Sequence, residues 1–242
     1  MTNVQFIVTA VSCEDTLIAD HGVLYPKNLA PYKNSTVLSH IVGEYSNLSP
    51  NISVVLSKNE IERFQTDRIL KDSFPDLRVV SAEGTAGALC SALLGLDYSK
   101  INTPLIIAPG DSFTQSETEA AINFFTQQNV EAGTIVFESN DSRYSFVRVN
   151  SANQITEIAE KRVISNLATT GLFYFRNLPT LLEGAGWALV NSRTHNNQYF
   201  VSHSFHRLIS RGAKTSIFQL RESHNYKFFK ENNPSRNNLE DK

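Results

Sequence analysis

Short apolar runs alternate with longer amphipathic segments along the chain as far as Asn129. The runs are rich in β-branched residues and short enough to be strands buried on both faces of a sheet. They predict strands at residues 4–11, 52–56, 77–80 and 105–108. The segments between them repeat their apolar positions with the period of a helix. They predict one helix that begins after Ser35, a suitable N-cap, and three further helices over residues 59–74, 81–94 and 115–128. The alternation predicts a doubly wound α/β sheet.

After Asn129 the pattern changes to strand-sized segments separated by polar turns, and several of them alternate apolar and polar positions. Such alternation is typical of antiparallel strands. Strands are predicted at residues 133–138, 144–149, 155–160, 170–175 and 215–220, and helices at 178–189 and 199–210. The polar residues from Arg221 onward are expected to be flexible or peripheral. We therefore expect one domain over residues 1–220, with halves 1–130 and 131–220, and a tail over 221–242.

The apolar run at residues 105–108 stops at Gly110 and the carboxylate of Asp111. Because open α/β sheets bind ligands beyond the carboxyl ends of their strands, a ligand is expected at Asp111. A carboxylate there suits Mg²⁺, which prefers one or two carboxylates together with substrate phosphates. The alternative is structural, with Asp111 as a turn or N-cap residue before the next helix.

Composition and charge exclude several classes of protein. A net charge of −2 gives no basic stripe, so a nucleic-acid partner is not expected. No apolar run is long enough to span a membrane and the amino terminus does not resemble a signal peptide, so a cytoplasmic protein without a membrane partner is expected. Cys13 and Cys90 are too few for a disulfide framework or a zinc site. His203 and His206 lack an acidic partner and are assigned a structural role, while homo-oligomerisation stays open.

Four motifs follow one another in a fixed order. They are Leu24-Tyr-Pro-Lys-Asn-Leu-Ala-Pro31, Gly84-Thr-Ala-Gly-Ala-Leu89, the strand end at Asp111, and the stretch from Arg143 to Phe175. Together they resemble the sugar-1-phosphate nucleotidyltransferases, or nucleotide-sugar pyrophosphorylases, over residues 3–220. The resemblance implies a Rossmann-like mixed sheet of the nucleotidyltransferase or GT-A type, with an additional small antiparallel sheet. It also implies nucleotidyl transfer from an NTP to a phosphorylated small-molecule acceptor such as a sugar phosphate, with Mg²⁺ as cofactor and pyrophosphate as product.

The same resemblance implies roles for individual residues. The implied catalytic residues are Lys27 on the NTP phosphates, Asp111 on the metal and Lys161 on the acceptor phosphate. The implied nucleotide-binding residues are Ala10, Ser12, Gly84, Thr85 and Gly110. The implied acceptor-binding residues are Tyr144, Glu160, Thr170 and Gly171. Simpler interpretations stay open: the two lysines as surface residues, and Gly84 and Gly87 as sites of close helix–strand packing.

Two parts of the family pattern are missing. The segment Ala10-Val-Ser-Cys-Glu-Asp-Thr-Leu17 lacks the glycines and the arginine of the family's triphosphate loop. Glycine lets backbone N–H groups close around phosphate and arginine clamps it, whereas Glu14 and Asp15 would repel it. The family's second metal aspartate is also absent, because the corresponding stretch supplies His224 and Asn225, which are weak ligands for Mg²⁺.

Three functions are therefore weighed. The first is an active nucleotidyltransferase. The second is a non-catalytic relative that binds nucleotide or nucleotide sugar as a sensor or as a partner subunit, which the altered loop at residues 12–16 favours. The third, a glycosyltransferase of related fold, would need an Asp-x-Asp motif near Asp111, and Pro109-Gly-Asp-Ser112 does not provide one. The active transferase ranks first.

Overall fold

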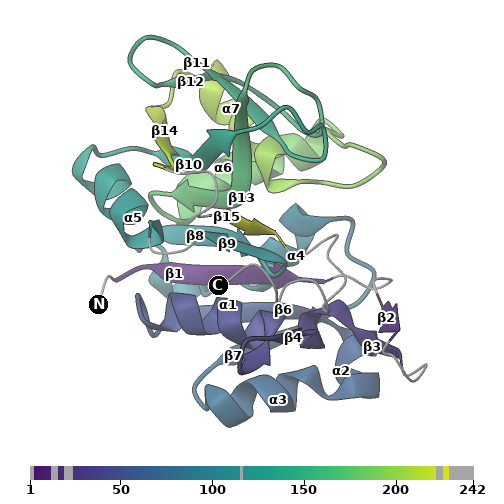
Figure 1. Ribbon diagram of the computed structural model, residues 1–242. Helices are drawn as coiled ribbons and strands as arrows, with labels where there is room; N and C mark the ends of the chain where they lie inside the picture. The colour runs from purple at the N-terminus through teal and green to yellow at the C-terminus, as the bar shows by residue number, and fades with distance from the viewer. Residues whose placement is uncertain (1–2, 12–15, 19–23, 115–116, 222–225, 229–242) are drawn as a thin grey trace.

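The computed structural model describes residues 3–11, 16–18, 24–114, 117–221 and 226–228 (Figure 1). Predictions that concern Ser12, Glu14, Asp15, His224 and Asn225 lie outside the described residues. In Figure 1 the N-terminal half forms the lower part of the molecule and most of the C-terminal half the upper part, and one mixed sheet runs through both.

The sheet is centred on β1 (Gln5–Ala10), which pairs in parallel with β6 (Ile52–Ser57) on one side and β8 (Leu105–Pro109) on the other. Strand β7 (Arg78–Ala82) extends the sheet beyond β6, also in parallel. The four strands predicted before Asn129 are thus confirmed. Because the chain builds outward from β1 in both directions, a crevice is expected between the carboxyl ends of β1 and β8.

The second half joins the sheet through β13 (Leu167–Phe175), which runs antiparallel to β8. Strand β10 (Ala132–Glu138) pairs antiparallel with β13 and in parallel with β14 (Thr215–Gln219). Strand β11 (Phe146–Val149) pairs antiparallel with β13 and with β12 (Ile155–Ala159). The result is a mixed sheet of nine strands within the described residues, as the changed pattern after Asn129 predicts.

Alternate residues of β1 belong to two separate cores. Phe6 and Val8 share a core with residues of α1 (Val37–Ser46) and α5 (Thr118–Gln127). Ile7 shares the other with residues of α4 (Ala88–Leu94), α6 (Leu178–Val190) and α7 (Phe205–Ser210). Helices thus cover both faces, which is why the central strands are apolar at successive positions. The doubly wound prediction is confirmed.

The helix predicted over residues 59–74 is wrong as a single element. It is two helices, α2 (Lys58–Phe64) and α3 (Thr66–Ser73), because Gln65 between them takes a left-handed conformation with φ of 53°. Leu70 of α3 is fully buried, whereas Ile61 and Phe64 of α2 are half-buried.

Other helix starts move by a few residues. Thr36 rather than Ser35 caps α1, since its hydroxyl accepts a hydrogen bond from the N–H of Ser39 at 3.2 Å. The helix predicted at residues 199–210 opens with the 3₁₀ turn η3 (Val201–Ser204) and continues as α7. Another 3₁₀ turn, η2 (Tyr98–Lys100), follows α4.

Small two-stranded antiparallel sheets accompany the main sheet, as predicted. They pair β2 (Thr16–Ile18) with β3 (Leu24–Pro26), β4 (Pro31–Tyr32) with β5 (Ser35–Thr36), and β9 (Ser112–Thr114) with β15 (Tyr226–Phe228). The last pair corrects the expectation that everything beyond Arg221 is flexible or peripheral. Residues 226–228 form a strand against the segment that directly follows Asp111.

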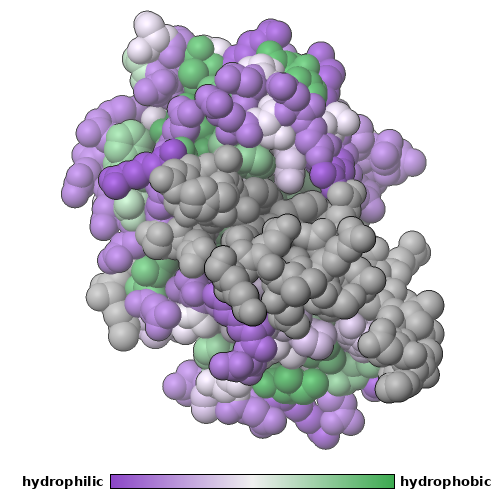
Figure 2. All heavy atoms as spheres, viewed as in Figure 1, coloured by the Kyte–Doolittle hydropathy of each residue, from purple (hydrophilic) through white to green (hydrophobic). Residues whose placement is uncertain are grey.

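The surface agrees with a molecule whose apolar residues are in the two cores. Figure 2 shows that hydrophilic residues dominate the coloured surface in this view, with hydrophobic residues in small separate areas. Among the described residues, no helix has the length and apolar character needed to cross a membrane.

Candidate active site

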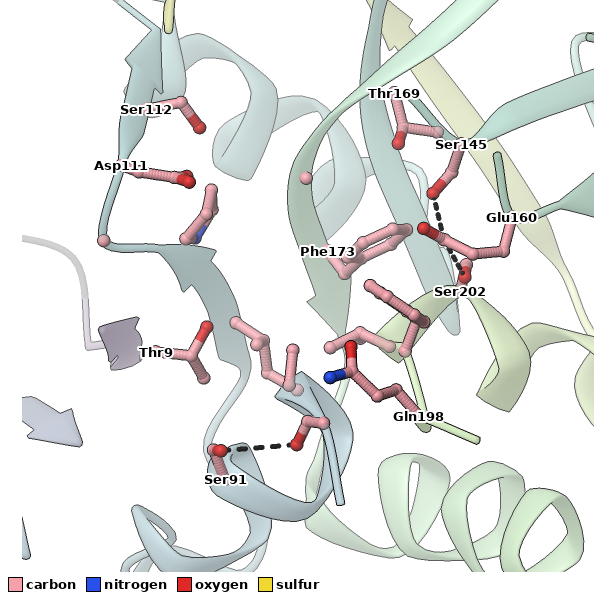
Figure 3. A pocket seen from close by; sticks show the side chains of 18 of the residues that line it. Thr9, Ser91, Asp111, Ser112, Ser145, Glu160, Thr169, Phe173, Gln198 and Ser202 are labelled. Carbon is pink, nitrogen blue, oxygen red and sulfur yellow. Dashed lines mark hydrogen bonds between the residues drawn. The ribbon is translucent and has the colours of Figure 1, made fainter. Parts of the chain in front are cut away.

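A cavity of about 540 Å³ opens beyond the carboxyl ends of β1 and β8 (Figure 3). Asp111 and Glu160 lie on opposite sides of it. The predicted site residues that line the cavity are Ala10, Thr85, Gly110, Asp111, Tyr144, Glu160, Lys161, Thr170 and Gly171. Lys27 and Gly84 do not line the cavity, although Lys27 contacts Asp111, and Ser12 is outside the described residues. The topology therefore gathers residues that are as many as 161 positions apart, from Ala10 to Gly171, around one space.

Lys27 and Asp111 form an ion pair on the β1–β8 side of the cavity. The Lys27 Nζ and Asp111 Oδ2 atoms are 3.8 Å apart, and only 7% of the lysine side chain is exposed, against 32% of the aspartate. Lys27 opens the 3₁₀ turn η1 (Lys27–Leu29) directly after Pro26, whose fixed φ suits that position. The interpretation of Lys27 as a surface lysine is therefore wrong.

Asn28 fixes the backbone that carries Lys27. Its Nδ2 atom donates to the carbonyl oxygen of Ala10 at 3.0 Å and to Glu60 Oε2 at 2.9 Å. Burial raises the pKa of Glu60, and the neighbouring Thr66 and Asn28 side chains oppose the rise. Asn28 also lines the cavity. It was missed from the sequence, although an asparagine beside Lys27 in a proline-flanked segment is a usable signal for such an anchor.

The turn that presents Asp111 depends on Gly110. A Cβ atom at Gly110 would lie 2.6 Å from the Cβ of Ala10, and the Gly110 N–H donates to the Thr9 carbonyl at 2.9 Å. Gly110 therefore lets the ends of β1 and β8 approach closely. After Asp111, Phe113 of β9 packs against the rings of Tyr32 and His40, with centroids 6.3 and 4.9 Å away. These contacts tie the Asp111 turn to the segment that follows Lys27.

The loop before α4 packs against the C-terminal half. At Gly87, φ is 103° and a Cβ atom would lie 2.6 Å from the carbonyl oxygen of Tyr199. The Leu89 N–H donates to that oxygen at 2.9 Å, and the Tyr199 N–H donates to Ala86 at 2.8 Å. The N–H of Leu89, near the start of this helix, is therefore used within the protein. Thr85 keeps a cavity position, with its hydroxyl 2.8 Å from that of Ser91.

Glu160 is held by two serine hydroxyls on the other side of the cavity. Ser145 and Ser202 both donate to its Oε2 atom, Ser202 at 2.8 Å (Figure 3). The next residue, Lys161, has a positive φ of 50° and places its Nζ 4.9 Å from the centroid of the Phe200 ring. An ammonium group over an aromatic face is electrostatically favourable. Ser145, Phe200 and Ser202 were missed, because the sequence gives no pattern that links them to residues 160 and 161.

The remaining predicted acceptor residues shape the same wall. The Thr170 hydroxyl is buried and donates to the carbonyl of Ile135 at 3.3 Å, so it supports the strand. At Gly171, φ is 84° and a Cβ atom would lie 3.1 Å from the ring of Pro109, so glycine permits the approach of β13 to β8. The Tyr144 ring packs edge-on against Phe137 with centroids 5.0 Å apart.

His203 lies in η3, directly after Ser202, and accepts a hydrogen bond at Nδ1 from the Phe200 N–H at 3.2 Å. Burial, with smaller contributions from His206, His195 and Arg193, lowers the pKa of His203 to about 4. The His203 and His206 rings are stacked with centroids 6.3 Å apart. These contacts are consistent with the predicted structural role of both histidines.

Acidification is expected to destabilise the protein because of His203. A histidine whose folded pKa is below the unfolded value of about 6.5 contributes fully above pH 6.5, and its contribution is lost as the pH falls towards about 4. The loss should reach about 3 kcal/mol, since one pKa unit corresponds to about 1.4 kcal/mol. Urea unfolding between pH 7 and pH 5 measures the slope. His203→Gln should flatten it, and an unchanged slope in that variant would contradict the assignment.

The residues present fit one Mg²⁺ ion that is shared with substrate phosphates. Asp111 offers a half-exposed carboxylate at the cavity wall. Among the described residues, no group of three or more His, Cys, Asp or Glu side chains could hold a metal by itself. Mg²⁺ commonly takes one or two carboxylates and completes its shell with water and phosphate oxygens. The donor set therefore suits a substrate-bridged ion.

The fold and the position of the cavity define an α/β protein of the nucleotide-binding class, with its ligand site at the switch point of the sheet. Residues 23–222 match the family model described as nucleotidyl transferase, and the chain belongs to that family. It is thus a nucleotidyltransferase, and the prediction of an enzyme of this type is confirmed. The binding-only alternative is not favoured.

Solved structures show the same fold at low sequence identity. A nucleoside-diphosphate-sugar pyrophosphorylase from Vibrio cholerae aligns with a TM-score of 0.79 and 16% identity, over 93% of this chain and 95% of that one. A Bacillus anthracis protein assigned as a glucose-1-phosphate thymidylyltransferase gives 0.70 and 14%, over 93% and 89%. The inositol-1-phosphate CTP transferase of T. maritima gives 0.68 and 19%, over 90% and 85%. No curated protein matches by sequence.

Proposed function

We propose that this nucleotidyltransferase joins the nucleotidyl group of an NTP to a sugar 1-phosphate or a similar hydroxylated phosphomonoester, with release of pyrophosphate. The observation that carries the proposal is the division of one cavity into two differently equipped sides. Asp111, which is ion-paired with Lys27, lies on the β1–β8 side, and Glu160 lies opposite, next in sequence to the cavity residue Lys161. Lys27 and Asp111 suit a triphosphate and its metal, because an ammonium group binds phosphate and a carboxylate binds Mg²⁺. Glu160 and Lys161 suit a sugar phosphate, because a carboxylate accepts hydrogen bonds from hydroxyl groups and an ammonium group binds phosphate.

The reaction is an in-line displacement at the α-phosphorus of the NTP. A phosphate oxygen of the acceptor forms a bond to this phosphorus, and the bond from the phosphorus to the oxygen bridging towards the β-phosphate breaks. The electron pair leaves with pyrophosphate, and no bond to the protein forms. Such transfers depend on positioning and charge neutralisation. The protein therefore has to hold two anionic substrates together.

Each charged residue has a defined task in this scheme. The Lys27 ammonium neutralises the triphosphate, and Lys161 holds the acceptor phosphate at the opposite side. Glu160 accepts hydrogen bonds from acceptor hydroxyl groups, with its Oε2 atom already engaged by two serines. Asp111 would hold Mg²⁺, which when bound neutralises phosphate charge. Thr85 and the backbone of Ala10 lie where the nucleotide would contact the wall.

The structural relatives support a hydroxylated acceptor. Their names refer to nucleoside-diphosphate sugars, glucose 1-phosphate and inositol 1-phosphate. The two acceptors named, glucose 1-phosphate and inositol 1-phosphate, each carry several hydroxyl groups near one phosphate. The cavity wall around Glu160 is correspondingly rich in hydroxyl and amide side chains, which include Ser145, Thr169, Gln198 and Ser202.

Pyrophosphate release tests the proposal directly. Each of the four common NTPs should be incubated with Mg²⁺ and one of several phosphomonoesters, including hexose 1-phosphates, inositol 1-phosphate and phosphocholine. We expect release with at least one hydroxylated acceptor and none with phosphocholine. Binding of nucleotide sugars, seen as thermal stabilisation, without release across the panel would overturn transfer and support the sensor alternative.

Other properties complete the proposal. We infer a cytoplasmic enzyme that works without a nucleic-acid or membrane partner, consistent with the net charge of −2. We also propose that residues 1–130 bind the nucleotide and residues 131–220 the acceptor. The division is supported by the origin of the cavity walls, since Asp111 precedes the boundary and Glu160 follows it.

A further inference from the structure

Residues 198–202, here called the connecting segment, contact elements on both sides of the cavity. The segment precedes and begins η3, and Gln198, Phe200, Val201 and Ser202 line the cavity. Figure 3 shows Gln198 and Ser202 on the same side as Glu160.

Backbone contacts join the connecting segment to the loop before α4. The Tyr199 backbone makes one hydrogen bond with the carbonyl of Ala86 in this loop and one with the N–H of Leu89 at the start of α4. The fit is close, because a Cβ atom at Gly87 would lie 2.7 Å from the Tyr199 nitrogen and 3.1 Å from the Cβ of Gln198. The segment is therefore fixed to the wall that carries Thr85.

Side-chain contacts join the same segment to the acceptor residues. Ser202 is only 1% exposed, and its hydroxyl donates to Glu160 Oε2 at 2.8 Å. The Phe200 ring lies 4.9 Å from Lys161 Nζ. Alternate residues of one short segment thus contact the two adjacent charged residues of the acceptor side.

Hydrogen bonds hold the connecting segment in place, so that its side chains can restrict those of Glu160 and Lys161. The Phe200 N–H is bonded to His203 Nδ1 at 3.2 Å, and the Tyr199 backbone is bonded to Ala86 and Leu89. A fixed hydrogen-bond donor restricts the carboxylate that accepts from it, and a ring restricts the ammonium group above it. Glu160 and Lys161 would otherwise have several rotamers each.

We propose that Ser202 and Phe200 are positioning residues for the acceptor: Ser202 orients Glu160 and Phe200 orients Lys161. The inference rests on the proposed function, because it takes Glu160 and Lys161 as the residues that bind the acceptor. Neither positioning residue has to touch the substrate. Their loss should weaken acceptor binding while the nucleotide side is left intact.

Steady-state kinetics of Ser202→Ala tests the first half. We expect the KM for the acceptor to rise about tenfold, as for loss of a hydrogen bond to a charged group, with the KM for NTP unchanged. The effect should disappear in a Glu160→Gln background, because interacting residues are not additive. The matched control is Ser204→Ala, which removes an equally buried hydroxyl that bonds to the Val201 carbonyl instead. The control should keep both KM values.

Phe200→Leu tests the second half and does not depend on the folding of the serine variant. We expect about a threefold rise in the acceptor KM, the size of a modest cation–π contact, and no further rise in a Lys161→Met background. Thermal unfolding of every variant shows whether it is folded.

The outcomes separate the two proposals. If Glu160→Gln raises the acceptor KM but Ser202→Ala and Phe200→Leu behave like Ser204→Ala, the positioning inference is wrong and the proposed function stands. If Ser202→Ala raises the acceptor KM by the same factor in the wild-type protein and in the Glu160→Gln background, the inference is also wrong. If Glu160→Gln and Lys161→Met leave the acceptor KM unchanged, the acceptor site itself is wrong and both proposals fall.

Discussion

Replacing Asp111 by asparagine is expected to lower kcat for pyrophosphate release by about 100- to 1000-fold, the usual loss for one preorganised electrostatic group. Asparagine has almost the same shape, so the change removes a charge at the cavity wall and leaves the volume unaltered. The magnesium concentration needed for half-maximal activity should rise at the same time, because a neutral amide is a poorer Mg²⁺ ligand than a carboxylate. Pyrophosphate release measured against Mg²⁺ concentration reports both quantities.

Stability has to be measured beside activity, since the change also breaks the ion pair with the buried Lys27. Breaking a fully buried pair costs about 3–5 kcal/mol, and the loss should be smaller here because 32% of the Asp111 side chain is exposed. Asp97→Asn is a matched control. Asp97 is 36% exposed and lies 3.8 Å from Lys100 Nζ, the same separation as in the Lys27–Asp111 pair, and it is not part of the cavity wall. Unchanged turnover in Asp111→Asn would rule out the metal and phosphate role of Asp111.

The main sheet was predictable because the pattern of apolar residues in each strand reflects which of its faces are buried. Consecutive apolar residues in β1, such as Phe6, Ile7 and Val8, face two different cores and have to be apolar at every position. The break between α2 and α3 was not predictable in the same way. Gln65 is neither glycine nor proline, and its left-handed conformation follows from the packing of two short helices.

The candidate site was predictable only in part. Asp111 follows a buried strand, so its place at the sheet edge can be deduced from local pattern alone. Its contact with Lys27 joins residues that are 84 positions apart in the sequence. No local pattern relates residues so far apart, and only the resemblance to a known family linked these two to one site. Ser202 is still harder to predict from the sequence, because serine is common in ordinary loops. Its contact with Glu160 over 42 positions becomes visible only in three dimensions.

Some predicted site residues have a structural task that the sequence did not suggest. Gly110 and Gly171 were assigned to nucleotide and acceptor binding, and both allow close approach between neighbouring strands. Gly110 lies against Ala10 and Gly171 lies against the ring of Pro109. These contacts are compatible with a place in the cavity wall, because a wall built from strand ends needs small residues where the strands converge. Binding roles for both glycines stay predictions.

Under the proposed function, the altered triphosphate loop is expected to leave more of the phosphate chemistry to Lys27 and Asp111. The segment from Ala10 to Leu17 supplies no arginine and no glycine. Lys27 is instead held in place by its neighbour Asn28, which bonds to the end of β1 and to Glu60. A lysine with 7% of its side chain exposed is desolvated, which opposes stability unless its charge is used or compensated. Such a residue is expected to matter more for activity than for folding.

Lys27→Met is therefore expected to lower activity strongly with little effect on stability. Activity should fall by about 100- to 1000-fold, because the triphosphate loses a preorganised cation. The midpoint of thermal unfolding should change little, because methionine fills a similar volume without a buried charge and the Asp111 carboxylate left behind is 32% exposed and can be hydrated. Asn28 still anchors the turn. Activity assays and thermal unfolding of the same preparation give both values.

Two further variants make the Lys27 test specific. Lys100→Met removes the lysine of the comparable Lys100–Asp97 pair and should leave turnover unchanged, because that pair is not part of the cavity wall. The double variant Lys27→Met, Asp111→Asn should be little worse than the more damaging single variant if both residues serve one bound phosphate–metal unit, because residues that act together are strongly non-additive. Independent, multiplicative losses would show that Lys27 and Asp111 act on different parts of the reaction. Unchanged activity in Lys27→Met with a lower unfolding temperature would make Lys27 a structural residue, and the triphosphate would then have to be neutralised by other groups.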